Sequence, residues 1–187
     1  MKKVILFLVL LLTLCVVLGL AGCTTPPLTL TYTYAVGDTG PAGGWIFYDK
    51  GSYSDGWRYL EAAPSDQSTG IQWYNGSYVV TGATGTAIGT GQANTTAIVT
   101  IQGAGSYAAQ LCNDLTVGSY DDWFLPSKDE LNKLYLNKVA IGGFADYDYW
   151  SSSEGNADNA WLQGFYNGSQ IYHYKGYTYR VRAVRAF

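Results

Sequence analysis

The first 22 residues decide which part of this chain can form a folded domain. Lys2 and Lys3 give a short positive start, and residues 4–20 are almost entirely apolar. Two small residues, Ala21-Gly22, end the apolar run. A positive start, an apolar stretch and small residues at its end predict an export signal that is removed from the mature protein. We therefore expect residues 1–22 to be a signal peptide and exclude them from the fold.

Cys23 makes this export signal more specific. The stretch Leu20-Ala21-Gly22-Cys23 resembles the lipobox of bacterial lipoproteins. The resemblance implies lipidation of the Cys23 thiol, and several acyl chains would hold the protein firmly on a membrane. The alternative is a plain membrane-spanning anchor. The apolar run is near the lower length limit for a span and has no basic stop-transfer flank.

The segment after the signal predicts how the domain is attached. Residues 23–36 would form the lipidated cysteine and a tether, stiffened at its start by Pro26-Pro27. Thr24 follows Cys23, whereas the familiar inner-membrane retention signal at this place is Asp. We therefore expect a lipid-anchored protein of the bacterial cell envelope, in the outer membrane and exposed at the surface.

Charge and cysteine usage exclude several classes of protein. The formal net charge of the whole chain is −3, and loss of Lys2 and Lys3 would make the exported part more acidic. No basic patch indicates nucleic acid as a partner. Cys15 leaves with the signal and Cys23 is lipidated, so Cys112 has no partner for a disulfide within the chain. We interpret Cys112 as a buried, inert residue of a helix.

Residues 37–187 are long enough for one domain, and the wealth of Gly, Thr, Ser, Asn and Tyr favours short strands and many turns. Strands are predicted at residues 45–48, 57–63, 149–154, 160–166, 169–174 and 177–187, with a hairpin at residues 73–80. Residues 82–94 are predicted to form a long surface loop. One helix is predicted over residues 104–117, and a second after Ser127, whose spacing from Glu130 is that of a capping box.

Four motifs resemble the Lcl C-terminal domain family. They are Trp123-Phe124-Leu125-Pro126-Ser127-Lys128-Asp129-Glu130-Leu131, Tyr149–Glu154, Ala160-Trp161 and Arg180–Arg185. The resemblance implies an α+β, C-type-lectin-like fold that is shared with formylglycine-generating enzyme. Two helices would pack beside small antiparallel sheets, and the N- and C-terminal strands would pair. Phe124 stands where the family often has Arg, which puts one local salt bridge in doubt.

Residues 147–187 carry a narrower resemblance. They are similar to the variable region of diversity-generating retroelement targets, in particular the treponemal variable lipoproteins. In those systems the adenines of a template are randomised, so scaffold positions alternate with variable ligand-binding positions. The resemblance assigns ligand binding to Asn156, Asp158, Asn159, Leu162, Tyr166, Asn167, Ser169, Tyr172, His173, Tyr174, Tyr177 and Tyr179.

The many tyrosines of this region fit a recognition surface. A tyrosine offers a rigid apolar ring and a hydrogen-bonding tip at low entropic cost. The alternative is the ordinary preference of tyrosine for strands. We predict an unknown protein or glycan ligand on a host, a neighbouring cell or a phage. A carbohydrate-binding adhesin of fixed specificity and a structural envelope lipoprotein remain alternatives.

The sequence does not predict an enzyme, a cofactor or a metal site. Formylglycine-generating relatives need two active-site cysteines and iron-dependent relatives need several histidines, whereas Cys112 and His173 stand alone. The calcium-binding tripeptides of sugar-binding C-type lectins do not occur. Asp146 and Asp148 offer too few oxygen atoms for a calcium cage. A degenerate enzyme that retains catalysis is the remaining alternative.

Overall fold

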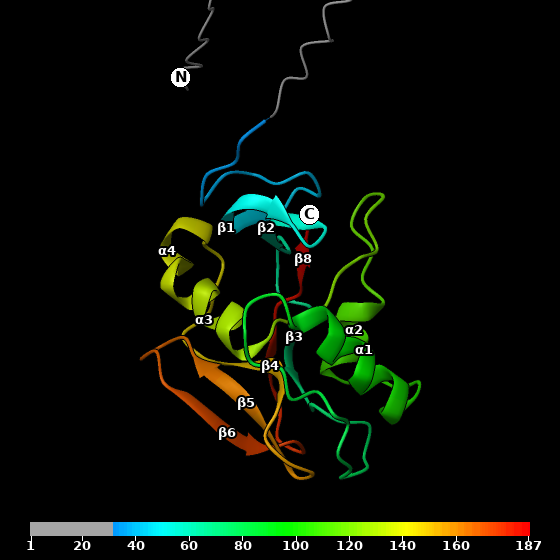
Figure 1. Ribbon diagram of the computed structural model, residues 1–187. Coiled ribbons are helices and arrows are strands. Elements are labelled where there is room, and N and C mark those ends of the chain that lie inside the picture. The colour runs from blue at the N-terminus through cyan, green and yellow to red at the C-terminus, as the bar shows by residue number, and fades with distance from the viewer. Residues whose placement is uncertain (1–31) are drawn as a thin grey trace, which may run out of the picture. The chain divides into compact units, whose positions relative to one another are not determined.

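The computed structural model describes residues 32–187, of which Thr33–Phe187 form one compact unit (Figure 1). The predicted signal peptide, Cys23 and most of the tether lie outside the described residues. No helix in the described part is long and apolar enough to cross a membrane.

The first sheet brings the two ends of the domain together. Strands β1 (Trp45–Ser54) and β2 (Trp57–Ala62) form an antiparallel hairpin, and β8 (Val184–Ala186) pairs with the other edge of β2. Asp55 and Gly56 connect β1 to β2 with positive φ angles of 52° and 84°. Two such residues form the turn that suits a twisted hairpin. β1 therefore extends well beyond the predicted strand 45–48.

The second sheet has the order β3-β7-β4-β5-β6. Its strands are β3 (Ser68–Ile71), β4 (Asp148–Glu154), β5 (Asn159–Gly164), β6 (Gln170–Tyr174) and β7 (Tyr179–Val181). All neighbours are antiparallel except β4 and β7. The predicted strand 177–187 is divided between the two sheets, as β7 and β8. The predicted hairpin at residues 73–80 is wrong, because this segment contains no strand.

Within the described residues four helices accompany the sheets, where two were predicted. They are α1 (Gly91–Gln102), α2 (Ala108–Asn113), α3 (Lys128–Leu136) and α4 (Lys138–Ile141). The capping box of α3 is confirmed: Ser127 Oγ accepts from the Glu130 amide at 3.3 Å, and Glu130 Oε2 accepts from the Ser127 amide at 2.7 Å. α1 was missed, since its first residues lie in the predicted loop 82–94.

Tertiary hydrogen bonds explain why α1 forms from a sequence with few helix signals. Asn94 is buried, and its side chain bonds both the amide and the carbonyl of Gly85. Thr95 does the same with Leu125. Ile98 completes the buried face of α1. These partners lie outside the helix, so its stability comes from tertiary contacts rather than from local propensity.

The core has two parts, which explains how two small sheets form one unit. One buried cluster contains Trp73, Trp150 and residues of α1 and α2. The other contains Phe47, Leu60 and residues of α3. Figure 1 shows α1 and α2 on one side of the second sheet and α3 and α4 on the other. The prediction of an α+β domain with terminal strands in a common sheet is therefore confirmed, although β8 pairs with β2 rather than with β1.

The C-terminal arginines are part of this scaffold. Asp66 Oδ1 accepts from Arg182 Nε at 2.7 Å, and Asp66 Oδ2 accepts from Arg180 at 3.0 Å and from the Tyr149 hydroxyl at 2.9 Å. Arg185 pairs with Glu61 at 3.1 Å and with Asp122 at 2.7 Å. These ion pairs join the two sheets to the loops around them. Because Arg182 and Arg185 are buried, they offer no basic surface.

Candidate ligand-binding surface

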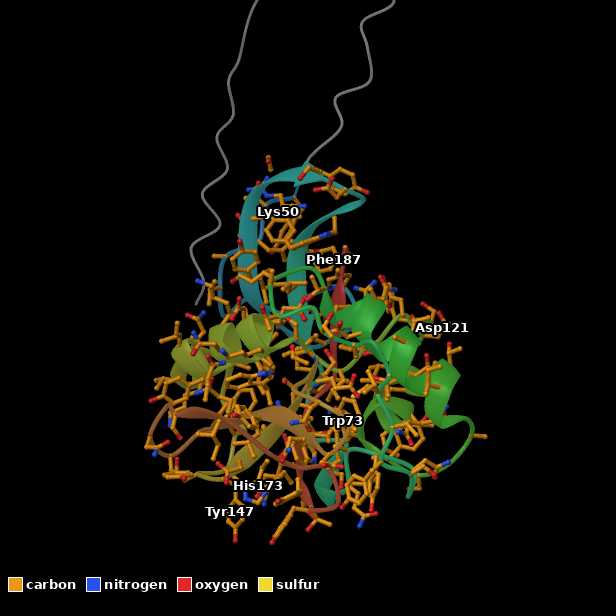
Figure 2. All side chains as sticks on the ribbon, turned by 60° about the horizontal axis from the view of Figure 1, so that its bottom comes forward. Lys50, Trp73, Asp121, Tyr147, His173 and Phe187 are labelled. Atoms are coloured by element: carbon orange, nitrogen blue, oxygen red, sulfur yellow. The ribbon has the colours of Figure 1, made fainter. Side chains whose placement is uncertain are left out.

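Strand register divides the predicted binding residues between the two faces of one hairpin. Trp161 opposes Tyr172 and Leu162 opposes Ile171 in the β5–β6 ladder. Because side chains alternate along a strand, Tyr172 and Tyr174 share one face, and Ile171 and His173 share the other. Figure 2 shows His173 at the end of the domain opposite Lys50. Most of the predicted residues therefore lie on β5, on the edge strand β6 or in the loops beside them, whereas Tyr179 lies on β7, and together they form no single flat patch.

The face that carries Tyr172 has an aromatic pair with its own cation. The rings of Trp161 and Tyr172 meet edge to face, with centroids 5.1 Å apart. Lys128 Nζ lies 3.8 Å from the centre of the Trp161 ring. Tyr172 and Tyr174 are 56% and 54% exposed, so most of their ring surface faces solvent. These two side chains can contact a ligand without a change in the core.

The opposite face is partly buried. The His173 ring meets Tyr177 at 4.6 Å and Tyr179 at 5.8 Å between centroids. Tyr179 in turn packs edge to face on the buried Trp150 at 4.7 Å. Burial raises the pKa of Tyr179, and the nearby Asp148 carboxylate adds to this shift. Tyr179 therefore supports this face as well as lining it.

Leu162 does not belong to the surface. Its side chain is 1% exposed and lies in the hydrophobic cluster of Trp150. The variable-region resemblance assigned Leu162 to ligand binding, but the cluster that buries its side chain also contains Trp73 of a loop and Ile98 of α1. The structure thus corrects the assignment of Leu162 to ligand binding.

The polar loop residues hold their own loops in shape. Asn156 Oδ1 accepts from the amides of Asp158 and Asn159, each at 2.9 Å. Asn167 Oδ1 accepts from the amide and the hydroxyl of Ser169 at 3.0 and 2.9 Å. Asparagine side chains often organise turns in this way. The two loops at the ends of β5 are consequently pre-formed beside the exposed tyrosines.

Tyr74 and Tyr78 belong to the same region and were missed by the sequence analysis. Their rings are 4.6 Å apart between centroids. A hydrogen bond with Tyr74, followed by partial burial and the charge of Asp158, raises the pKa of Tyr78. The signal that could have found them was the tyrosine content of residues 73–80, which we attributed to a hairpin.

A buried ion pair connects these segments and was also missed. Lys175 Nζ lies 2.5 Å from Glu154 Oε1 and 3.0 Å from the Val79 carbonyl oxygen. Glu154 also accepts from the amides of Thr81 and Gly82. Burial lowers the pKa of Lys175, and the bond to Glu154 opposes this change. Nothing in the sequence distinguished Lys175 from an exposed turn residue.

Unsatisfied polar atoms gather in the same part of the chain. Among residues 32–187, the buried side-chain atoms without a hydrogen-bond partner are Asp148 Oδ1, Gln163 Oε1, His173 Nδ1 and Arg180 Nε. All four residues belong to the second sheet. Burial raises the pKa of Asp148, and the nearby His173 opposes this shift. Such atoms retain capacity for hydrogen bonds to water or to a ligand.

The described residues contain no arrangement typical of a metal centre. No three His, Cys, Asp or Glu side chains within residues 32–187 gather closely enough to hold a metal ion. Cys112 is buried and its thiol pKa is raised by that burial. A thiol in this environment is a poor nucleophile.

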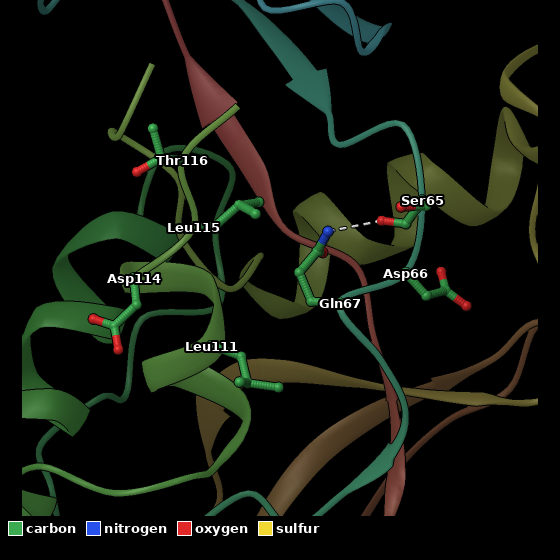
Figure 3. A pocket seen from close by; sticks show the side chains of 7 residues that line it. All are labelled: Ser65, Asp66, Gln67, Leu111, Asp114, Leu115 and Thr116. Atoms are coloured by element: carbon green, nitrogen blue, oxygen red, sulfur yellow. Dashed lines mark hydrogen bonds between the residues drawn. The ribbon is translucent and has the colours of Figure 1, made fainter. Parts of the chain in front are cut away.

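None of the exposed tyrosines lines a separate pocket of about 430 Å³ (Figure 3). Residues 65–67 form one wall, and α2 with the loop that follows it forms the other. Asp66 is already bound to Arg180 and Arg182, and Gln67 Nε2 donates to the Ser65 carbonyl oxygen. The polar groups of this pocket therefore serve the scaffold, and none of the predicted binding residues lines it.

The fold and the surface together define an α+β domain that presents exposed aromatic side chains along one sheet edge. Residues 63–185 match the model of the Lcl C-terminal domain, and the chain belongs to this family. No curated protein matches the chain. The match includes the motifs around Trp123, Tyr149, Ala160 and Arg180 from which the resemblance was first inferred.

Proposed function

We propose that this protein is a lipid-anchored ligand-binding protein of the bacterial cell surface with a C-type-lectin-like fold. The observation that carries the proposal is the set of exposed tyrosines on pre-formed loops and a sheet edge. Tyr166, Tyr172, Tyr174 and Tyr177 are each more than half exposed. Large aromatic side chains cost more to leave in water than polar ones, and binding surfaces commonly use them.

The rigid support of these side chains favours binding over a purely structural role. The Lys175–Glu154 pair holds the β6–β7 turn, and the Asn156 and Asn167 turns hold the neighbouring loops. Recognition gains affinity when the binding surface is ordered before the ligand arrives. We propose no catalytic activity for this surface.

The finer proposal is that residues 147–187 are diversified by a retroelement. Exposed positions in the loops and on β6 lie between buried segments in this region, so many substitutions are possible without loss of the core. Deep sequencing of the locus in a clonal population tests this directly. We expect changes at adenine-derived codons of the exposed positions and constancy at Arg182, Lys175 and Gly168. Uniform sequences would reject diversification and leave an adhesin of fixed specificity.

Anchoring requires its own experiment, because Cys23 lies outside the described residues. Metabolic labelling with an alkyne fatty acid should mark the natural chain and not Cys23→Ser. The same substitution should release the protein from the membrane fraction. Protease treatment of intact cells then decides between surface and periplasmic exposure.

Ligand binding is tested with the full-length chain on a glycan array and against a phage-displayed peptide library. The triple variant Tyr172→Ala, Tyr174→Ala, Tyr177→Ala should lose the binders that the natural chain selects. Tyr179 is omitted because it packs on Trp150. Tyr53→Ala is the matched control, since Tyr53 is 70% exposed on the β1–β2 hairpin. Unchanged binding by the correctly folded triple variant would refute the proposal.

A further inference from the structure

Four tyrosines form one cluster around the β6–β7 turn. Tyr174 and Tyr177 are stacked, with ring centroids 6.4 Å apart, and the Tyr177 amide donates to the Tyr174 carbonyl oxygen at 3.0 Å. Gly176 lies within this turn. A Cβ atom on Gly176 would lie 2.8 Å from the Tyr78 hydroxyl oxygen and 3.3 Å from that of Tyr74. We call Tyr74, Tyr78, Tyr174 and Tyr177 the four-tyrosine cluster.

A second feature of the cluster is that, within residues 32–187, no cation lies over its rings. Every lysine and arginine of residues 32–187 lies within 6 Å of an aromatic ring centre, and none of them lies over this cluster. These residues are Lys50, Arg58, Lys128, Lys133, Lys138, Lys175, Arg180, Arg182 and Arg185. Lys175 belongs to the turn, but its ammonium group lies over Trp73, 4.5 Å from the ring centre. The rings of Tyr78, Tyr174 and Tyr177, which are 49%, 54% and 55% exposed, thus offer a π surface without a bound positive charge, and Tyr74 packs behind them against the core.

A carboxylate accompanies this surface. Asp158 is exposed, precedes the strand residue that opposes Tyr174, and acts electrostatically on both Tyr78 and Lys175. It takes part in no ion pair in the described part of the chain. Lys175 is already neutralised by Glu154. The net charge around the cluster is therefore negative, in a chain whose formal charge is −3.

We propose, building on the ligand-binding function above, that the four-tyrosine cluster and Asp158 bind an arginine side chain of a protein partner. A planar guanidinium can stack on a tyrosine ring while it donates two hydrogen bonds to a carboxylate. The tyrosine hydroxyls are additional acceptors. Tyrosine and arginine, together with tryptophan, are enriched among the residues that dominate the binding energy of protein interfaces. The cluster thus selects a basic protein segment rather than an acidic glycan.

The test measures binding of a fluorescent arginine-rich peptide to the full-length chain by anisotropy. The same peptide with citrulline in place of arginine keeps the size and removes the charge. Asp158→Asn should weaken binding of the arginine peptide about tenfold, since a charged hydrogen bond is lost. Tyr177→Ala should weaken it about fivefold through the lost cation–π contact. Circular dichroism checks that both variants fold.

Two control variants separate the site from general attraction to an acidic protein. Asp55→Asn changes the net charge by the same amount, and the Asp55 side chain is 86% exposed on the distant β1–β2 hairpin. Tyr53→Ala removes an exposed tyrosine there. Both controls should bind the arginine peptide like the natural chain. Equal losses in Asp55→Asn and Asp158→Asn would overturn the proposal, because binding would then depend on net charge alone.

Failure of this inference is distinguishable from failure of the proposed function. The library and array binders could be lost in the tyrosine triple variant while the arginine and citrulline peptides bind equally. The surface would then bind a ligand, and the arginine proposal would be rejected. Preference for arginine that depends on Asp158 and Tyr177 supports it.

Discussion

Lys175 Nζ lies 2.5 Å from Glu154 Oε1, and both side chains are at most 1% exposed. The pair joins the end of β4 to the turn between Tyr174 and Tyr177. Glu154 also binds the amides of Thr81 and Gly82. One buried contact thus joins three segments, two of which carry exposed tyrosines, and it links the stability of the domain to the shape of the proposed binding surface.

Removal of Lys175 should destabilise the domain strongly. Lys175→Met leaves the buried Glu154 carboxylate without its cation, which costs about 3 kcal/mol. The double variant Glu154→Gln, Lys175→Met removes both charges and should recover part of the loss. Urea denaturation measures these free energies of unfolding. Lys50→Met, which breaks the pair with the 86% exposed Asp55 side chain, should lower the free energy of unfolding by less than about 1 kcal/mol. A similar small loss for Lys175→Met would contradict the structural role.

Leu162 and Tyr172 should respond in opposite ways to truncation. Leu162→Ala creates a cavity in the core and should lower the free energy of unfolding by about 3 kcal/mol. Tyr172→Ala removes a side chain that is 56% exposed and should cost about 0.5 kcal/mol. Denaturant titration gives both values. If Leu162→Ala were as mild as Tyr172→Ala, the original assignment of Leu162 to the surface would regain support.

Asp148→Asn should stabilise the protein at pH 7. Burial raises the pKa of Asp148 above its ordinary 3.8, so the ionised carboxylate is less favourable in the folded state than in the unfolded state. The protonated carboxyl group of Asp148 therefore favours the folded state. This contribution to stability is fully present below pH 3.8 and is lost as the pH rises through the folded-state pKa. Asp148→Asn should therefore raise the free energy of unfolding by about 1 kcal/mol at neutral pH and leave it unchanged in acid.

Thermal unfolding across the acid range checks this sign. Asp146→Asn is the matched control, because the Asp146 side chain is 83% exposed. A loss of stability in Asp148→Asn at pH 7 would show that the Asp148 charge is satisfied in the folded protein, for example by His173.

Ser127→Ala should lower the free energy of unfolding by about 2 kcal/mol. The Ser127 hydroxyl accepts from the Glu130 amide and donates to the Ala87 carbonyl oxygen at 2.9 Å, so the change removes a helix cap and a tertiary contact. Ser127→Thr keeps both hydrogen-bonding functions and is the comparison for steric effects in this buried site. Chemical denaturation is the measurement, and a cost below about 0.5 kcal/mol for Ser127→Ala would exclude the combined role.

Local sequence signals were sufficient for several elements whose deciding partners are close in the chain, although not for the segment 73–80. The Ser127–Glu130 capping box predicted the start of α3, and alternation of side chains predicted β5 and β6. The family motifs predicted an α+β domain with its terminal strands in one sheet.

Tertiary structure decided the features whose partners are distant in sequence. α1 depends on bonds from Asn94 to Gly85 and from Thr95 to Leu125, and Lys175 depends on Glu154. Alternation showed that Leu162 and Tyr172 occupy strands, but it could not tell which face is covered. The sequence by itself determined which residues form the tyrosine-rich strands and turns. Only packing of helices and loops against the second sheet determined which of those side chains remain exposed, because burial depends on elements that local patterns do not contain.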